Sequence, residues 1–135
     1  MTGAVLVLNA GSSSLKFAVY GGDHDLPLRL KGALSRLRHA PRLRVEADGD
    51  AIVDRPFDQP MALTQAADAV FAQIDALGWL PRIGVVGHRI VHGGRAFVDP
   101  TVLDPESIGA LRRLTPLAPL HQPYNLDIAE SAARL

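Results

Sequence analysis

Two apolar runs flank a short glycine- and serine-rich stretch at the start of this chain, and they constrain its fold most strongly. Residues 4–8 read Ala-Val-Leu-Val-Leu, residues 9–16 read Asn-Ala-Gly-Ser-Ser-Ser-Leu-Lys, and residues 17–20 read Phe-Ala-Val-Tyr. This pattern predicts two strands of a hairpin, over residues 4–9 and 15–20. Because the first run is continuously apolar, we expect that strand to be central and covered on both faces.

The predicted turn is rich in groups that bind anions. It offers backbone N–H groups, three hydroxyls, the amide of Asn9 and the ammonium of Lys16, which together could hold a phosphate and its metal ion. It is not a Walker loop, because Lys16 enters a β-like segment instead of a helix. Plainer interpretations stay open: a structural glycine–serine turn, Asn9 as a cap of that turn, and Lys16 as an outward-facing lysine.

A second polar cluster lies far downstream, where residues 87–94 read Gly-His-Arg-Ile-Val-His-Gly-Gly. A short buried strand over 83–87 would deliver His88 and Arg89 to its C-terminal end, where α/β sheets place ligands. Arg89 could bind a carboxylate or phosphate with two parallel hydrogen bonds, or pair with a structural acid. His88 and His92 do not form a zinc pair, since a strand followed by a glycine loop does not set them on one face. The two clusters together indicate phosphoryl transfer.

The rest of the chain predicts an α/β fold with a mixed sheet. We expect a strand over 28–37, a hairpin of 43–46 and 51–54 around an Asp-Gly turn, and helices over 60–77, 105–114 and 125–135. The last helix is more apolar than a solvated terminal helix needs to be. We therefore expect an exposed apolar patch around Ile128 and Ala132.

Composition narrows the function classes. The 135 residues suffice for one ordinary domain, and 14 basic residues balance 14 acidic ones, which argues against nucleic acid or a membrane surface as partner. The absence of cysteine excludes disulfides and thiolate metal sites. No apolar run approaches the roughly 18 residues of a membrane span, and no basic leader precedes the first strand, so a cytoplasmic protein is expected.

The motifs resemble those of one family, the acetate kinases, a group that also includes propionate and butyrate kinases. Residues 9–16 resemble its N-terminal signature, residues 87–94 its second signature, and residues 117–126 a third segment. Gln122 stands where that segment normally has Asn, Tyr124 where it has Ala, and Arg95 where an acidic residue usually follows the second signature. The resemblance implies the fold of the sugar kinases, actin and Hsp70, with a ribonuclease-H-like mixed sheet and flanking helices.

The resemblance also implies roles for individual residues. Asn9 would help to place Mg²⁺, and His121 would support the substrate site. ATP phosphates would lie against Gly11, Ser12, Ser13, Ser14 and Lys16. Arg89 would bind the carboxylate of acetate, whereas Val91 and Leu120 would contact its methyl group. The implied reaction transfers the γ-phosphoryl group of ATP to acetate and gives acetyl phosphate.

Residues 1–135 are expected to form an N-terminal acetate-kinase-like domain, because the family's catalytic aspartate and its adenosine-binding segments come later. With the C-terminal domain absent, the chain would be inactive alone and would need a complementary polypeptide; full-length relatives are expected to form homodimers. Two alternatives stay open. The chain could be a non-catalytic module that binds a carboxylate or phosphate, or it could belong to a propionate or butyrate kinase, since one methylene changes binding by only about 1–3 kcal/mol.

Overall fold

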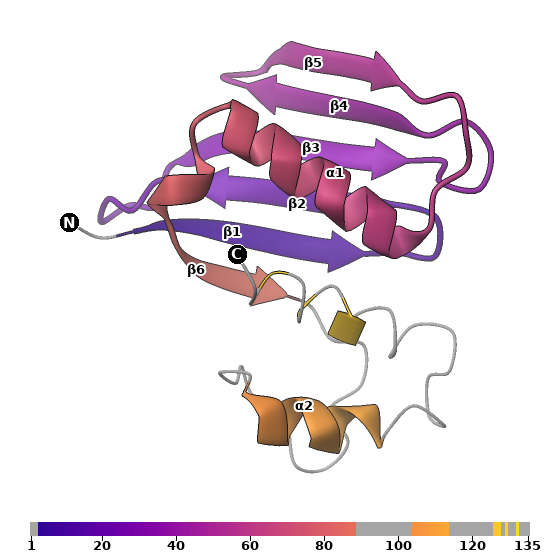
Figure 1. Ribbon diagram of the computed structural model, residues 1–135. Helices are drawn as coiled ribbons and strands as arrows, with labels where there is room; N and C mark the ends of the chain where they lie inside the picture. Colours follow the sequence, from indigo (N-terminus) through magenta and orange to yellow (C-terminus); the bar gives the residue numbers. More distant parts are fainter. Residues whose placement is uncertain (1–2, 89–103, 114–125, 128, 130–131, 133–135) are drawn as a thin grey trace.

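The computed structural model describes residues 3–88, 104–113, 126, 127, 129 and 132. Its elements are β1 (Ala4–Ala10), β2 (Leu15–Tyr20), β3 (Leu28–Ser35), β4 (Arg42–Ala47), β5 (Asp50–Pro56), α1 (Leu63–Ala76), a 3₁₀ turn η1 (Leu80–Arg82), β6 (Ile83–His88) and α2 (Pro105–Arg112). The predicted mixed α/β sheet is confirmed, with α1 lying across one face of it and α2 beyond its β6 edge (Figure 1).

The six strands form one sheet in the order β5-β4-β3-β2-β1-β6. Strands β1 to β5 form an antiparallel meander, and β6 pairs with β1 in parallel. The chain leaves β5 at one edge, passes through α1 and returns as β6 at the other edge. Both predicted hairpins are therefore present, and the first signature spans the β1–β2 turn.

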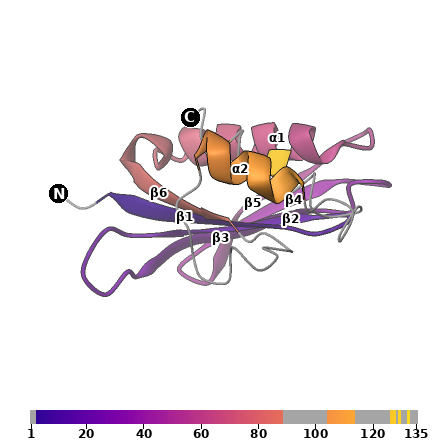
Figure 2. The same cartoon turned by 90° about the horizontal axis from the view of Figure 1, so that it is seen from below.

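Strict alternation of side chains gives the sheet two different faces. One face carries fully buried side chains under α1, among them Leu6, Leu8, Leu15, Leu34 and Leu43. Figure 2 shows α1 on this side of the sheet. The helix contributes Ala66, Ala67, Val70, Phe71 and Ile74 to the same core.

The other face differs from expectation at β1. Val7 is 39% exposed and Asn9 is exposed, so the prediction that β1 is covered on both faces is wrong. The continuous apolar run has two causes: Leu6 and Leu8 fill the core under α1, whereas Val5 and Val7 form the apolar part of an open face.

Local chemistry sets the ends of the turns and helices. Asp48 and Gly49 have φ values of 53° and 82°, the left-handed pair that joins two antiparallel strands in a tight hairpin. Gly78, with φ of 82°, follows α1 as predicted. The helix begins at Leu63 instead of residue 60, because the Met61 N–H donates to the Leu37 carbonyl at 2.8 Å and holds the preceding segment outside the helix.

Two findings concern the described residues after β6, the cap of α2 and the burial of Ala132. Asp104 caps α2 by accepting a hydrogen bond from the Ser107 N–H at 2.7 Å. Ala132 is only 7% exposed and belongs to the main core cluster, so the predicted exposed patch around it is wrong. The apolar face of that segment packs inward; Ile128, the other residue of the patch, lies outside the described residues.

Candidate functional site

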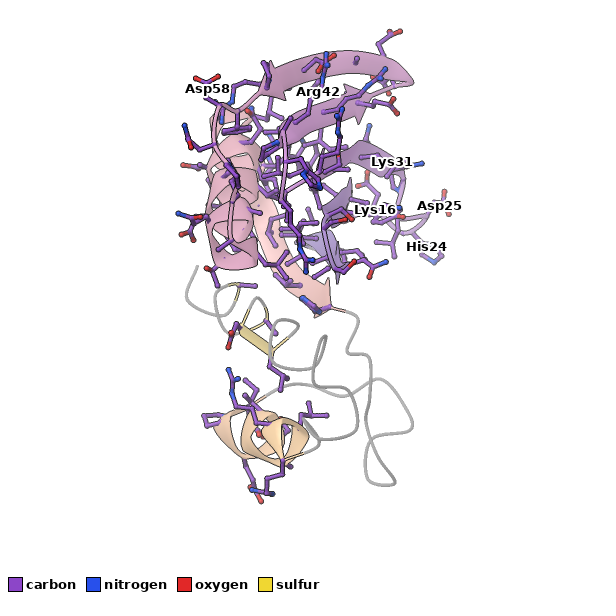
Figure 3. All side chains as sticks on the ribbon, turned by 90° about the vertical axis from the view of Figure 1, so that its right-hand side faces the viewer. Lys16, His24, Asp25, Lys31, Arg42 and Asp58 are labelled. Carbon is purple, nitrogen blue, oxygen red and sulfur yellow. The ribbon has the colours of Figure 1, made fainter. Side chains whose placement is uncertain are left out.

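The structure sets Asn9 and Lys16 directly opposite each other on β1 and β2. Both side chains are exposed and border the same hollow on the face of the sheet away from α1. Figure 3 shows Lys16 on this side of the ribbon. Lys16 is thus not at a sheet edge, since β2 lies between β1 and β3. The hairpin itself brings an amide oxygen and an ammonium together.

The turn between these two residues is short and anchored. The Gly11 N–H donates to the Ser14 carbonyl at 2.8 Å, and the Leu37 N–H donates to the Ser13 carbonyl at 3.0 Å. Gly11, Ser12 and Ser13 are exposed, and Ser14 is half-buried. The hydroxyls therefore lie on a turn whose backbone is tied to the β3–β4 connection.

Strand β6 brings the second signature alongside the first. Gly87 pairs with Val7 and His88 with Leu8, so β6 ends one residue short of Asn9 in the shared register. The predicted strand is confirmed and ends at His88, but the prediction that it is buried is wrong, because β6 is an edge strand and Val85 is 60% exposed. Arg89, which was predicted at the same strand end, is the next residue in the sequence. Arg89, Val91, Leu120 and His121 lie outside the described residues, and their predicted roles stay predictions.

The hollow beside Asn9 and Lys16 has a volume of about 480 Å³. Its walls include two cations that the sequence analysis did not single out, Lys31 and Arg44. The signal was present, because basic and apolar residues alternate along β3 and β4 and alternation places the basic ones on a single face. Only strand order could show that this face is also the face of Lys16.

Other charges near this face are already paired. The Arg42 guanidinium donates two hydrogen bonds to the Asp54 carboxylate, the longer being 3.0 Å from Nη2 to Oδ2. These bonds lower the pKa of Asp54 and raise that of Arg42. The Arg44 guanidinium lies 3.8 Å from Glu46, a looser ion pair at a solvated site.

Beside the serine turn, within the part of the chain that the structure describes, Asn9 is the candidate ligand for a divalent cation. Among the described residues, no group of three His, Cys, Asp or Glu side chains could hold a metal ion. Asn9 supplies an exposed amide oxygen, and Mg²⁺ in proteins commonly takes one or two side-chain oxygens together with waters and substrate phosphates. The donor set therefore fits a magnesium ion carried in with a phosphate ligand.

Comparison with known proteins decides the family. The sequence matches the model of the Acetokinase family over residues 4–135. The chain belongs to this family. The resemblance that the three motifs indicated is thereby confirmed.

Two relatives show how far the similarity extends. An acetate kinase of Rhodopseudomonas palustris is 39% identical over 140 residues, which cover 100% of this chain and 35% of that protein. An acetate kinase of Nitrobacter hamburgensis is 40% identical over 132 residues, or 92% of this chain and 32% of that protein. The chain thus spans about a third of the length of the curated relatives that it matches.

Solved structures agree on the fold. Acetate kinase from Porphyromonas gingivalis superposes with a TM-score of 0.83 at 29% identity, over 98% of this chain and 34% of that one. A propionate kinase from Francisella tularensis gives 0.80 at 26% identity, over 93% of this chain and 32% of that one. The mixed sheet with its helices is therefore the arrangement found in part of these kinases.

Within the described residues, no helix is long and apolar enough to cross a membrane.

Proposed function

We propose that this chain binds the phosphates of Mg²⁺-bound ATP and contributes to phosphoryl transfer to acetate, which yields acetyl phosphate and ADP. The observation that carries the proposal is the pairing of Asn9 with Lys16 beside the anchored serine turn. Family membership and the position of β6 next to Asn9 support it.

In this proposal an oxygen of the acetate carboxylate attacks the γ-phosphorus. A new bond forms between the carboxylate oxygen and the γ-phosphorus. The bond between the γ-phosphorus and the β,γ-bridging oxygen breaks, and ADP leaves with that electron pair. Acetate is already a nucleophile, so no strong base is needed. The barrier lies in bringing one anion to another, and cations and fixed hydrogen-bond donors lower it.

The residues divide this work as follows. Lys16 would neutralise phosphate charge, and the hydroxyls of Ser12, Ser13 and Ser14 would donate to phosphate oxygens. Asn9 would supply one oxygen ligand to Mg²⁺, whose charge offsets that of the phosphates when it is bound. Arg89 would hold the carboxylate, with Val91, Leu120 and His121 around the acyl group.

The relatives are about three times as long as this chain, which bears on the partners that it would need. We propose that turnover needs a complementary C-terminal polypeptide and that the complete enzyme forms a homodimer. The similarity to a propionate kinase keeps a longer acyl chain as the second candidate substrate.

The test separates nucleotide binding from turnover. Titration calorimetry of the folded chain with ATP and Mg²⁺ is expected to show binding that weakens in Lys16→Ala and, with Mg²⁺ present, in Asn9→Ala. Arg55→Ala, on the distant edge strand β5, is the control of equal charge change. Acyl phosphate trapped as hydroxamate then reports turnover from acetate or propionate, with Arg89→Ala as the control, alone and with the C-terminal part of a relative added.

The outcomes differ clearly. Nucleotide binding without turnover, even after addition of the C-terminal part, would favour the non-catalytic binding module. A folded chain that binds no Mg²⁺-bound ATP would refute the proposal. Turnover by the chain alone would refute the need for a complementary polypeptide.

A further inference from the structure

Three cations, Lys16, Lys31 and Arg44, lie around Ala33 on the open face of the sheet and are called the ring of cations here. In the strand register, Lys16 of β2 and Arg44 of β4 lie on either side of Ala33. Lys31 lies two residues before Ala33 on β3 and therefore projects from the same face. Figure 3 shows Lys16 and Lys31 together on the side away from α1.

Short side chains make the centre of this ring hollow. Ala33 stands between Lys16 and Arg44, and Ala18 stands between Val7 and Lys31 across the strands. Because a methyl group is flanked by a longer side chain on each side, the surface sinks there. The hollow extends from this point to the apolar side chains of Val7, Tyr20 and Leu28, and its whole volume is about 480 Å³.

The charge of the ring is not balanced. Glu46 is the one acid among the described residues that line the hollow. It lies opposite Lys31 in the register and 3.8 Å from the Arg44 guanidinium. Asp54, opposite Arg44, is hydrogen-bonded to Arg42. Among the ion pairs of the described residues, none includes Lys16 or Lys31. Asp54 also attracts the Arg44 guanidinium, because the charge of Arg44 helps to lower the pKa of Asp54. Lys16, Lys31 and Arg44 still place more positive than negative charge around the hollow, and an anion bound there would be attracted by all three.

We propose that this hollow is a binding site for a polyphosphate chain, with Lys31 and Arg44 extending the phosphate contacts of Lys16 across the sheet. This proposal rests on the proposed function in one respect, which is that both assign phosphate binding to Lys16. The spacing favours a chain of phosphates over a single one, because β2 and β4 lie about 10 Å apart, two strand spacings, which exceeds the width of one phosphate. Lys31 and Arg44 are then positioned to bind phosphates that lie beyond the reach of the serine turn.

Charge and volume variants test the site with inorganic tripolyphosphate, orthophosphate and ATP as probes, without Mg²⁺. Lys31→Ala and Arg44→Ala are each expected to weaken tripolyphosphate binding by roughly 3- to 10-fold. Ala33→Leu, which fills the hollow without changing charge, is expected to weaken it as well. Glu46→Gln is expected to strengthen it, because it removes the competing carboxylate from Arg44. Arg55→Ala, away from the hollow, is the matched control and is expected to bind as the parent does.

The comparison of probes identifies the source of the anion. Equal weakening of tripolyphosphate and ATP binding assigns the hollow to nucleotide phosphates, whereas loss with tripolyphosphate alone assigns it to free polyphosphate. Orthophosphate is expected to bind more weakly and to depend less on Arg44. Lys31, Arg44 and Arg55 are exposed, whereas Ala33 and Glu46 are half-buried. Circular dichroism verifies that each variant is folded.

Tripolyphosphate affinity that is unchanged in Lys31→Ala and Arg44→Ala, or lowered equally by Arg55→Ala, would overturn the site. The proposed function has its own readout, the Mg²⁺-dependent effect of Asn9→Ala. The two proposals can therefore fail independently.

Discussion

Replacing Gly32 by alanine tests how tightly the helix-covered face of the sheet is packed. Gly32 lies opposite Phe17, whose ring is buried on the helix side. A Cβ at Gly32 would lie 2.7 Å from Phe17 Cε1 and 2.8 Å from the carbonyl oxygen of Arg44. The ring is enclosed by the core, and the carbonyl belongs to a paired strand, so neither can move away without disturbing the sheet.

The expected cost follows from this geometry. Overpacking of a well-packed core costs about 1–3 kcal/mol, and the lower entropy of the unfolded alanine chain returns about 0.4–1 kcal/mol. We therefore expect Gly32→Ala to lower the free energy of unfolding by about 1–2 kcal/mol, and the melting temperature by about 3–10 °C for a chain of this size.

Gly109→Ala is the matched control, because Gly109 lies within α2 and a Cβ there would have no atom of the described residues within 4 Å. Helix propensity predicts that it stabilises α2 by about 0.5–1 kcal/mol. Thermal unfolding followed by circular dichroism, with the fluorescence of the single tryptophan Trp79 as a second probe, measures both variants. A Gly32→Ala variant as stable as the parent would refute the packing argument.

Three further predictions concern stability. Leu8→Ala is expected to cost about 2–5 kcal/mol in urea unfolding, whereas Val7→Ala, its neighbour on the open face, costs less than about 1 kcal/mol; equal costs would mean that both faces are covered. Gly49→Ala places a Cβ at φ of 82° and is expected to cost about 1 kcal/mol by the same assay, with no loss if the hairpin tolerates another turn. Arg42 lowers the folded-state pKa of Asp54, so the pair stabilises the fold above a pH of about 4 and ceases to do so as the pH falls through that lowered pKa. Asp54→Asn should therefore lower the midpoint of urea unfolding at pH 7 but not in strong acid. An equal effect at both pH values would contradict the ion pair.

Local signals predicted most of the described elements. The Asp48–Gly49 turn and the stop at Gly78 depend on left-handed backbone geometry that few residue types adopt, so both are readable from a few letters. The start of α1 was less predictable, because the Met61 N–H bonds to Leu37, a residue far away in the chain. Ala132 was misjudged for a related reason: an apolar helix face shows that something packs on it, but not what.

The amino-acid sequence by itself determined the family, the hairpin that carries the first signature and the pairing of Asn9 with Lys16, since a short turn between two strands sets its own register. Only the tertiary structure decided that Lys31 and Arg44 share a hollow with Lys16 and that β6 ends beside Asn9. The physical reason is the range of the interactions. Turn geometry and alternation act within a few residues, whereas strand order depends on how the whole chain buries its apolar surface under α1.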